Sequence, residues 1–315
     1  MTDRPLVSIV TPSLNQGRFI EATIHSIRSQ TYDRFEHIVV DGGSTDDTVD
    51  ILRRLEGAYP MRWLSEPDRG MYDAVNKGMR LASGDILAYL NSDDVYMPWA
   101  LQTAVFAFNH DADIDLVFGD GIRFEQSTGA QTLRLVPPFQ KERILFAGSL
   151  IQPAVYWRRR LFERQGGFDS RLRYVGDLDY WLRAAEHAQI AHIAEVLCVE
   201  RAHEEAFSSA YRERMSVEER GTRSERGADL ESLMGRKKEA AAIRRNKVWQ
   251  RRLWLRFFAA HLKGDPAGPW MQLRANGGLS VSPVRLAVGQ LPRLGPRYLA
   301  DAVRSDLVSE LMENP

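Results

Sequence analysis

The stretch that decides the fold runs from residue 7 to residue 41 and reads VSIVTPSLNQGRFIEATIHSIRSQTYDRFEHIVVD. It opens on the β-branched run Val7–Val10, which predicts a strand. Apolar residues then recur at a helical spacing through Phe19–Ser29, and His37–Val40 predicts a second strand closed by the turn Asp41–Gly43. Strand, helix and strand in this order predict a βαβ unit.

The same alternation continues to residue 90. A further helix is expected from Ser44, as its N-cap, to about Leu55, because Asp46 and Asp47 are favourable in a first helical turn. The other expected elements up to residue 90 are strands at Met61–Leu64 and Ile86–Leu90 and a helix at Tyr72–Ala82. Short apolar strands separated by helices predict a Rossmann-like α/β fold, with a mostly parallel sheet flanked by helices.

The pattern is more mixed beyond residue 115. It predicts short strands at Leu116–Phe118 and Val196–Glu200, a hairpin within Phe124–Leu135 and a helix at 178–187. The second of these strands contains Cys198, the single cysteine of the chain. One cysteine excludes a disulfide scaffold and a cysteine-based zinc site, and it is typical of a reducing compartment.

Charge and hydropathy narrow the class of protein further. The 315 residues carry 42 basic and 42 acidic side chains, which argues against a nucleic-acid binder over the whole surface. The beginning of the chain lacks the pattern of a secretory signal, and no run of about 18 apolar residues is present that could span a bilayer. We therefore expect a cytoplasmic protein.

The neutral total hides two parts of opposite charge. Summed from the sequence, residues 1–210 carry about −8 and residues 211–315 about +8. This predicts an α/β domain over 1–210 and a basic, mainly helical extension over 211–315. Within the extension, residues 241–264 hold seven basic and no acidic residues, with Trp249, Leu253 and Phe257 on one helical face. Such a helix fits a membrane surface, but it equally fits packing on its own domain or on a second subunit.

Four polar clusters follow the predicted strands, at Pro12–Asn15, Asp41–Ser44, Glu66–Arg69 and Asn91–Asp94. Ligands of open α/β sheets bind beyond the carboxyl ends of the strands, so one binding rim is expected there. Asp93 and Asp94 suit Mg²⁺ or Mn²⁺, although a polar turn would have the same residues. Asp41 and Asp68 can accept hydrogen bonds from a base or a ribose, and Asp41-Gly42 is also a turn signal.

Six segments, in this order, resemble glycosyltransferase family 2: VSIVTPSLNQ, VVDGGSTDDT, SEPDRGMYDAVNKG, ASGDILAYLNSDD, QPAVYWRRRLFERQGGFD and GDLDYWLRAA. They cover about residues 5–210. The resemblance implies the GT-A fold and an inverting, metal-dependent enzyme that uses a nucleotide-sugar donor. The implied acceptor is a hydroxyl of a glycan or of a lipid-linked molecule in polysaccharide or glycolipid assembly.

The resemblance also assigns roles to single residues. The implied nucleotide-sugar contacts are Pro12, Asn15, Asp41, Asp68 and Asp93. Asp94 and His203 are the implied ligands of Mn²⁺ or Mg²⁺, and Asp177 is the implied general base, preceded by Gly176 where many members have glutamate. Without the resemblance, Asp177 fits equally well as the N-cap of the helix that follows. Gln152 and Pro153 are expected to line the acceptor cleft, and Trp181 and Arg183 to pack and anchor the loop.

Two alternatives to this enzyme remain open at this point. One is a non-catalytic nucleotide-sugar-binding or scaffold protein of the same fold, which the presence of both Asp94 and Asp177 disfavours. The other is a sugar-phosphate nucleotidyltransferase, which needs a glycine-rich basic loop after the first strand, whereas Thr11–Asn15 has neither feature. The expected partners are a nucleotide-sugar donor, a glycan or lipid-linked acceptor, a membrane surface and a second copy of the chain. No nucleic acid is expected among them.

Overall fold

The computed structural model describes residues 4–136, 139, 141, 144–145, 150–227, 279–281 and 312. The basic helix predicted at 241–264 lies outside these residues, as does most of the extension. The strands are β1 (Val7–Ser13), β2 (Phe35–Asp41), β3 (Met61–Ser65), β4 (Ile86–Tyr89), β5 (Val95–Tyr96), β6 (Leu116–Glu125), β7 (Ala130–Arg134), β8 (Val155–Arg158), β9 (Ile190–Ala202) and β10 (Leu279–Val281). The helices are α1 (Gly17–Arg28), α2 (Thr48–Leu55), α3 (Met71–Leu81), α4 (Ala100–His110), α6 (Arg159–Gln165), α7 (Gly176–Ala184), α8 (Phe207–Ala210) and α9 (Arg212–Glu225).

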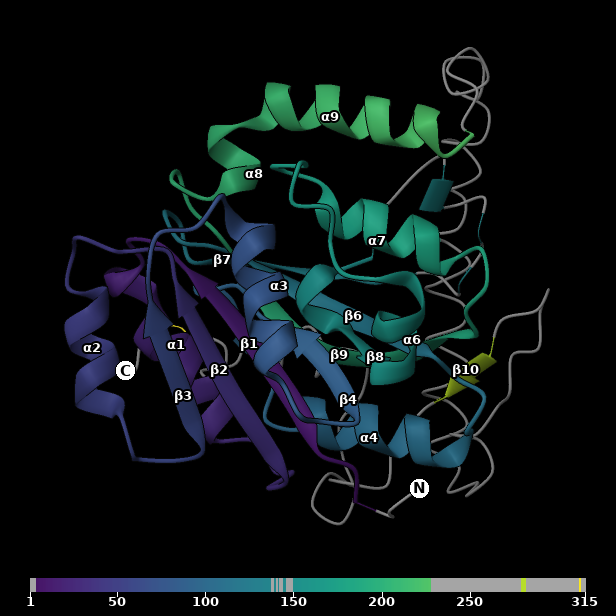
Figure 1. The fold of residues 1–315 in the computed structure, drawn as a ribbon, viewed down its shortest axis with the longest axis horizontal. Helices are drawn as coiled ribbons and strands as arrows, with labels where there is room; N and C mark the ends of the chain where they lie inside the picture. The colour runs from purple at the N-terminus through teal and green to yellow at the C-terminus, as the bar shows by residue number, and fades with distance from the viewer. Residues whose placement is uncertain are drawn as a thin grey trace.

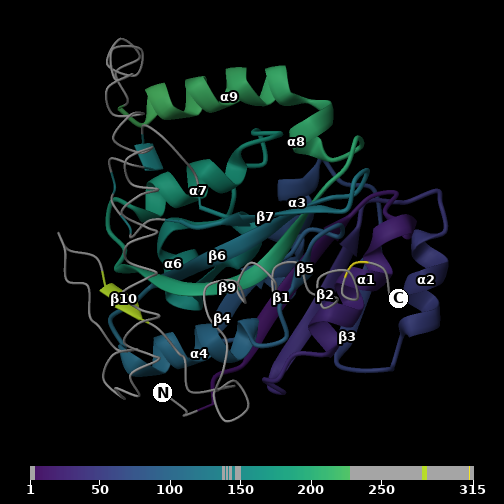
Figure 2. The same cartoon turned by 180° about the vertical axis from the view of Figure 1, so that it is seen from behind.

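The described strands form one sheet in the order β10-β9-β6-β8-β4-β1-β2-β3, with β5 paired to β9 and β7 paired to β6 (Figures 1 and 2). Strands β4, β1, β2 and β3 are parallel to one another, as the first ninety residues predict. Strand β8 runs antiparallel to both β4 and β6. The sheet therefore has a parallel half, whose strands are followed by all four polar clusters, and a mixed half beyond β4.

Neighbouring residues of a strand serve opposite faces of the sheet. Ile9 of β1 packs in the cluster that contains the inner face of α4, whereas Val10 packs in the cluster that contains α3 and α7. Both side chains are fully buried. Because side chains alternate along a strand, the two helix layers are fixed by the same short run Val7–Val10.

Two predictions of local structure are wrong. Helix α2 begins at Thr48 rather than with Ser44 as its cap, because the Ser44 N–H and hydroxyl both bind Asp41 and belong to the preceding turn. Strands β6 and β9 are also longer than predicted. They pair along Leu116–Glu125, where Gly121 leaves room for the buried Cys198. A Cβ at Gly121 would lie 3.0 Å from the Cys198 sulfur, so this glycine serves close strand pairing rather than ending the strand.

Helix α3 lies unusually close to β1. A Cβ at Gly78 would lie 2.4 Å from Cγ1 of Val10, a distance that real side chains do not tolerate. We expect Gly78→Ala to lower the free energy of unfolding by about 1–3 kcal/mol, as overpacked cores do, measured by denaturant unfolding. Gly221→Ala is the matched control, because Gly221 lies within α9 with no atom within 4 Å of its Cβ position. Equal stability of the two variants would contradict this close packing.

The first part of the extension packs on the α/β domain. In both views α9 lies alongside α7 (Figures 1 and 2). Arg223 of α9 donates to the carbonyl oxygens of Ile144 and Leu145, and Arg226 pairs with Asp179 of α7. The domain boundary at residue 210 stays a prediction. None of the described helices is long and apolar enough to cross a membrane.

Candidate active site

The binding rim predicted from the sequence is built from four loops that follow β1, β2, β3 and β4. The first two are tied together by Asn15, whose backbone has a positive φ of 53°. Its side-chain oxygen accepts from the Thr45 N–H at 2.8 Å, and its own N–H donates to Ser44 at 2.7 Å. Pro12 is buried within β1, beside Val40 of β2, and so shapes the rim from below.

Asp41 closes β2 with a carboxylate that is fully buried. Its oxygens accept from the N–H groups of Gly43 and Ser44 and from the hydroxyls of Ser44 and Ser65. Asp41 and Gly42 therefore form the turn that the sequence predicts as one of two alternatives. A direct contact between Asp41 and a base stays a prediction, and these partners show that Asp41 fixes the shape of the loop.

Asp68 lies beside the Asp41 turn. A Cβ at Gly42 would be 2.7 Å from an Asp68 carboxylate oxygen, so the missing side chain at Gly42 makes room for Asp68. The other oxygen accepts from the Gly70 N–H at 2.7 Å. Burial raises the pKa of Asp68, because a charged carboxylate loses solvation there. The fold therefore brings together Asp41 and Asp68, which the sequence separates by a whole strand–loop unit.

The adjacent carboxylates Asp93 and Asp94 face opposite ways. Asp94 is 6% exposed, and its Oδ1 accepts from the backbone N–H of Arg201 at 2.9 Å. Burial, and then the charge of Asp93, raise the pKa of Asp94 well above its usual range. Asp93 has a more exposed side chain, and its Oδ2 lies 3.0 Å from Nε2 of His203. Asp94 thus joins the loop to β9, whereas Asp93 faces the histidine.

Strand β9 brings Arg201 to this loop, and His203 follows directly after the strand. The Arg201 guanidinium donates to the Asp93 carbonyl at 3.0 Å and lies over the Phe19 ring. The His203 ring also packs on Phe19, with ring centres 4.4 Å apart. Its Nδ1 atom is buried and has no hydrogen-bond partner among the described residues. The imidazole is therefore held by packing, with Nε2 directed at Asp93.

The pair Asp93 and His203 fits a divalent cation. Octahedral Mg²⁺ holds neighbouring ligands at bond lengths of about 2.1 Å, which places two such ligands about 3.0 Å apart. The two facing atoms have this separation, which is also the length of the hydrogen bond that joins them in the structure. Among the described residues, no group of three or more His, Cys, Asp or Glu side chains is arranged to hold a metal. A cation held by this pair would take its remaining ligands from phosphate oxygens and water.

Asp177 lies in the first turn of α7, which begins at Gly176 with Val175 as its N-cap residue. It is therefore inside the helix and not its cap, contrary to the alternative weighed from the sequence. The Tyr72 hydroxyl of α3 lies 3.1 Å from its Oδ1. Burial raises the pKa of Asp177, while the hydrogen bonds that it accepts from the Leu178 N–H and from Tyr72 act in the opposite direction.

The remaining expectations concern residues around the site. Trp181 is fully buried, and Arg183 donates to Asp179 and to two carbonyl oxygens of the loop at 165–167, as predicted for packing and loop-anchoring residues. Gln152 is 8% exposed, donates to the Tyr89 carbonyl and accepts from Asn91, the first residue of the loop that carries Asp93. A role of Gln152 and Pro153 in an acceptor cleft stays a prediction.

Sequence reasoning assigned no role to Tyr72 or Asn91, although both lie in segments that carry the family resemblance. Their positions in the sequence could have indicated a role. Tyr72 begins the helix predicted after Asp68, and Asn91 begins the loop that contains Asp93. Tyr89 shows how compact the site is, because Asp177 and Asp94 both act electrostatically on its buried hydroxyl. The base candidate and the acidic loop are therefore both within electrostatic range of one tyrosine hydroxyl.

An α/β sheet of this order, with carboxylates gathered beyond its parallel strands, defines the class of GT-A glycosyltransferases, and comparison with known proteins agrees. The family model described as "Glycosyl transferase family 2" matches residues 8–165. The chain belongs to glycosyl transferase family 2.

Two relatives from mycobacteria illustrate the similarity. The chain is 37% identical to an uncharacterized glycosyltransferase of Mycobacterium tuberculosis over 202 residues, which are 63% of this chain and 76% of that protein. It is also 37% identical to a PGL/p-HBAD biosynthesis glycosyltransferase of Mycobacterium bovis over 183 residues, which are 57% of this chain and 69% of that protein.

Solved structures confirm the GT-A fold. The complex of Staphylococcus aureus TarS residues 1–349 with UDP-GlcNAc has a TM-score of 0.57 and 21% identity, covering 71% of this chain and 67% of that one. The mannosyltransferase PcManGT from Pyrobaculum calidifontis, in complex with GDP-Man and Mn²⁺, has a TM-score of 0.52 and 20% identity, covering 77% and 81%. Against a longer TarS structure the chain covers 39% of that chain's length.

Proposed function

We propose that the protein transfers a sugar from a nucleotide-diphosphate donor to an acceptor hydroxyl, with inversion at the anomeric carbon. The observation that carries this proposal is Asp177, a partly buried carboxylate to which the Tyr72 hydroxyl donates and which, like Asp94 of the acidic loop, acts electrostatically on Tyr89. Burial raises the pKa of Asp177 towards that of an effective general base. A base in this place serves a reaction in which a hydroxyl must lose its proton as it attacks.

The proposed reaction is a single displacement. The acceptor oxygen forms a bond to the anomeric carbon, the bond from that carbon to the diphosphate oxygen breaks, and the hydroxyl proton moves to an Asp177 carboxylate oxygen. The nucleoside diphosphate leaves with the electron pair of the broken bond. Because one attack occurs from the side opposite the leaving group, the configuration of the sugar inverts.

We assign the donor to the rim formed by Pro12, Asn15, Asp41 and Asp68. Asn15 and Asp68 present polar atoms beyond the strands, and Asp41 holds the loop between them. Nucleotide sugars are bound by TarS and by PcManGT, whose fold this chain shares. That likeness supports a donor of the same chemical class without specifying the base or the sugar.

We assign the divalent cation to Asp93 and His203, with Asp94 as the residue that anchors their loop. When bound, Mn²⁺ or Mg²⁺ supplies Lewis-acid stabilisation of charge on the leaving diphosphate. The chain's own contribution is to hold the two ligand atoms 3.0 Å apart and to fix the imidazole against Phe19. The structure of PcManGT with GDP-Man and Mn²⁺ supports the use of such an ion.

The acceptor is proposed to be a glycan or a lipid-linked hydroxyl in polysaccharide or glycolipid assembly. This proposal is supported by the chain's 37% identity to a PGL/p-HBAD biosynthesis glycosyltransferase. Three statements stay predictions from the sequence. They are the contact of residues 241–264 with a membrane surface, the location in the cytoplasm and the association with a second copy of the chain.

A hydrolysis screen tests the function. The full chain is incubated with a panel of UDP-, GDP- and TDP-linked sugars, with Mn²⁺, with Mg²⁺ or with EDTA. We expect nucleoside diphosphate to be released from one donor or a few, and only with a metal present. Binding of a nucleotide sugar without any turnover, with acceptor extracts included, would instead favour the non-catalytic binding protein.

A further inference from the structure

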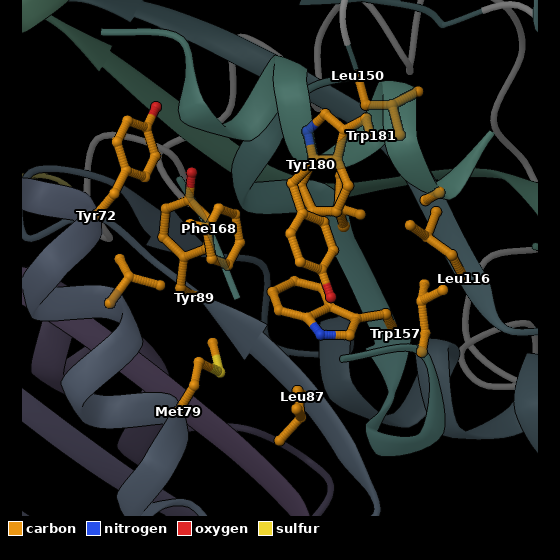
Figure 3. Packing of buried hydrophobic residues seen from close by; sticks show 14 of the residues in the cluster. Tyr72, Met79, Leu87, Tyr89, Leu116, Leu150, Trp157, Phe168, Tyr180 and Trp181 are labelled. Atoms are coloured by element: carbon orange, nitrogen blue, oxygen red, sulfur yellow. The ribbon is translucent and has the colours of Figure 1, made fainter. Parts of the chain in front are cut away.

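Tyr72 is a buried tyrosine that belongs to both the core and the active site. Its ring is 2% exposed and stacks on Phe168 at the edge of the large aromatic cluster, with ring centres 5.8 Å apart. Figure 3 shows its hydroxyl directed away from Phe168, Tyr180 and Trp181. The ring is therefore fixed by packing, and its hydroxyl is left to serve a polar neighbour.

That neighbour is the carboxylate of Asp177. The Tyr72 hydroxyl lies 3.1 Å from Asp177 Oδ1 and 3.3 Å from the Tyr174 carbonyl oxygen. Both facing atoms are acceptors, and burial raises the pKa of Tyr72 well above its usual range. The phenol therefore stays protonated and donates, and donation to a charged carboxylate is the stronger of the two bonds.

Gly176 makes this contact possible. A Cβ at position 176 would lie 2.7 Å from Cδ2 of the Tyr72 ring and 2.8 Å from Cε2. The neighbouring atoms belong to a ring packed into the core, which cannot give way cheaply. A side chain at position 176, including glutamate, therefore has no room while Tyr72 occupies this place.

The backbone before Asp177 is held from the other side by α9. One Glu218 oxygen accepts from the Arg173 N–H at 2.8 Å, and the other accepts from the N–H groups of Tyr174 and Val175 at 2.6 and 3.1 Å. This fixes the carbonyl of Tyr174 beside the Tyr72 hydroxyl. The carboxylate and the chain that carries it are thus held by two separate elements.

We propose that Tyr72 is a positioning residue for Asp177, occupying the space beside Gly176 and directing the Asp177 carboxylate by donating a hydrogen bond to it. The proposal rests on the proposed function, since it takes Asp177 as the base. Tyr72 touches neither the donor nor the acceptor in this account. Its action is to favour the ionised, correctly turned carboxylate.

The charged surroundings of Asp177 determine the sign of the expected effect. Titratable groups face it or its partner Tyr72 from three elements: Tyr72 on α3, Tyr89 on β4, and Glu218 and Glu219 on α9. Burial and the acidic residues favour protonation, whereas the Tyr72 hydrogen bond favours the charged form. Removal of that bond therefore raises the pKa of Asp177. As the pH falls, the variant loses the ionised carboxylate at a higher pH than the unchanged protein does.

The test is the pH profile of Tyr72→Phe, measured as release of nucleoside diphosphate from the donor found in the screen. We expect the acidic limb of kcat to move up by about one pH unit, because one hydrogen bond to a charged group is worth about a tenfold change in ionisation. At pH values above the acidic limbs of both proteins, kcat of the variant should fall much less. Affinity for the nucleoside diphosphate should stay within about twofold of that of the unchanged protein.

Tyr180→Phe is the matched control, since it removes a hydroxyl from the same aromatic cluster and Tyr180 stacks on the same Phe168 ring. It should leave the acidic limb in place. An unshifted limb in Tyr72→Phe, or an equal loss of kcat at every pH, would overturn the positioning role. Turnover retained by Asp177→Asn would instead remove the proposed base itself, so the two failures are distinguishable.

Discussion

Replacing Asp177 by asparagine is expected to lower kcat by about 10²–10⁴-fold, the range that a positioned general base contributes. Asparagine keeps the shape of the side chain and can still accept from Tyr72, but it cannot take a proton from the acceptor hydroxyl. Because Asp177 lies on α7 and the donor rim follows β1, β2 and β3, affinity for the nucleoside diphosphate should be almost unchanged. Steady-state turnover and calorimetric binding of the nucleoside diphosphate measure the two quantities separately.

The matched control for Asp177→Asn is Asp113→Asn, the same chemical change at an exposed position in the turn after α4. Its turnover should equal that of the unchanged protein. If Asp177→Asn also retains turnover, the general base lies elsewhere. If it loses both turnover and nucleotide affinity, the substitution has altered the fold of the rim and a different role must be sought.

The second large effect is expected at Asp93. Asp93→Asn should raise the concentration of Mn²⁺ needed for half-maximal activity by about 100-fold or more. Even the outer partners of metal ligands contribute 10–100-fold to metal affinity. The physical reason is the facing pair, in which Asp93 Oδ2 and His203 Nε2 lie 3.0 Å apart. Activity is measured against Mn²⁺ concentration after EDTA treatment, and binding is measured by calorimetry in the presence of nucleoside diphosphate.

Asp94→Asn provides the comparison for Asp93→Asn. An asparagine there can still accept from the Arg201 N–H, the bond that anchors the loop. We therefore expect a smaller change in the Mn²⁺ requirement than for Asp93→Asn. The reverse ranking would return the role of metal ligand to Asp94, as expected from the sequence alone. A chain that is fully active in EDTA would remove the metal site altogether.

The sequence was most informative where β-branched and other apolar residues were concentrated in a short run. Val7–Val10 and Ile86–Leu90 predicted buried parallel strands, and both are present in β1 and β4. It was least informative where a polar or small residue interrupted an element. Ser44 has the side chain of a helix cap, yet it binds Asp41, and the strand predicted to end at Phe118 continues through Gly119 and Gly121 as β6. Local propensity cannot distinguish these cases, because the deciding partner is distant in the chain.

The sequence by itself determined the family, the α/β fold and the set of carboxylates, because these follow from residue types and their order. Only the tertiary structure decided which carboxylate meets which partner. Asp93 and Asp94 are adjacent in sequence, but one faces His203 and the other the backbone of Arg201, each more than a hundred residues away. Tyr72 and Asp177 are likewise joined across 105 residues. Hydrogen bonds and burial depend on such distant pairs, and those alone set the charge and direction of a side chain.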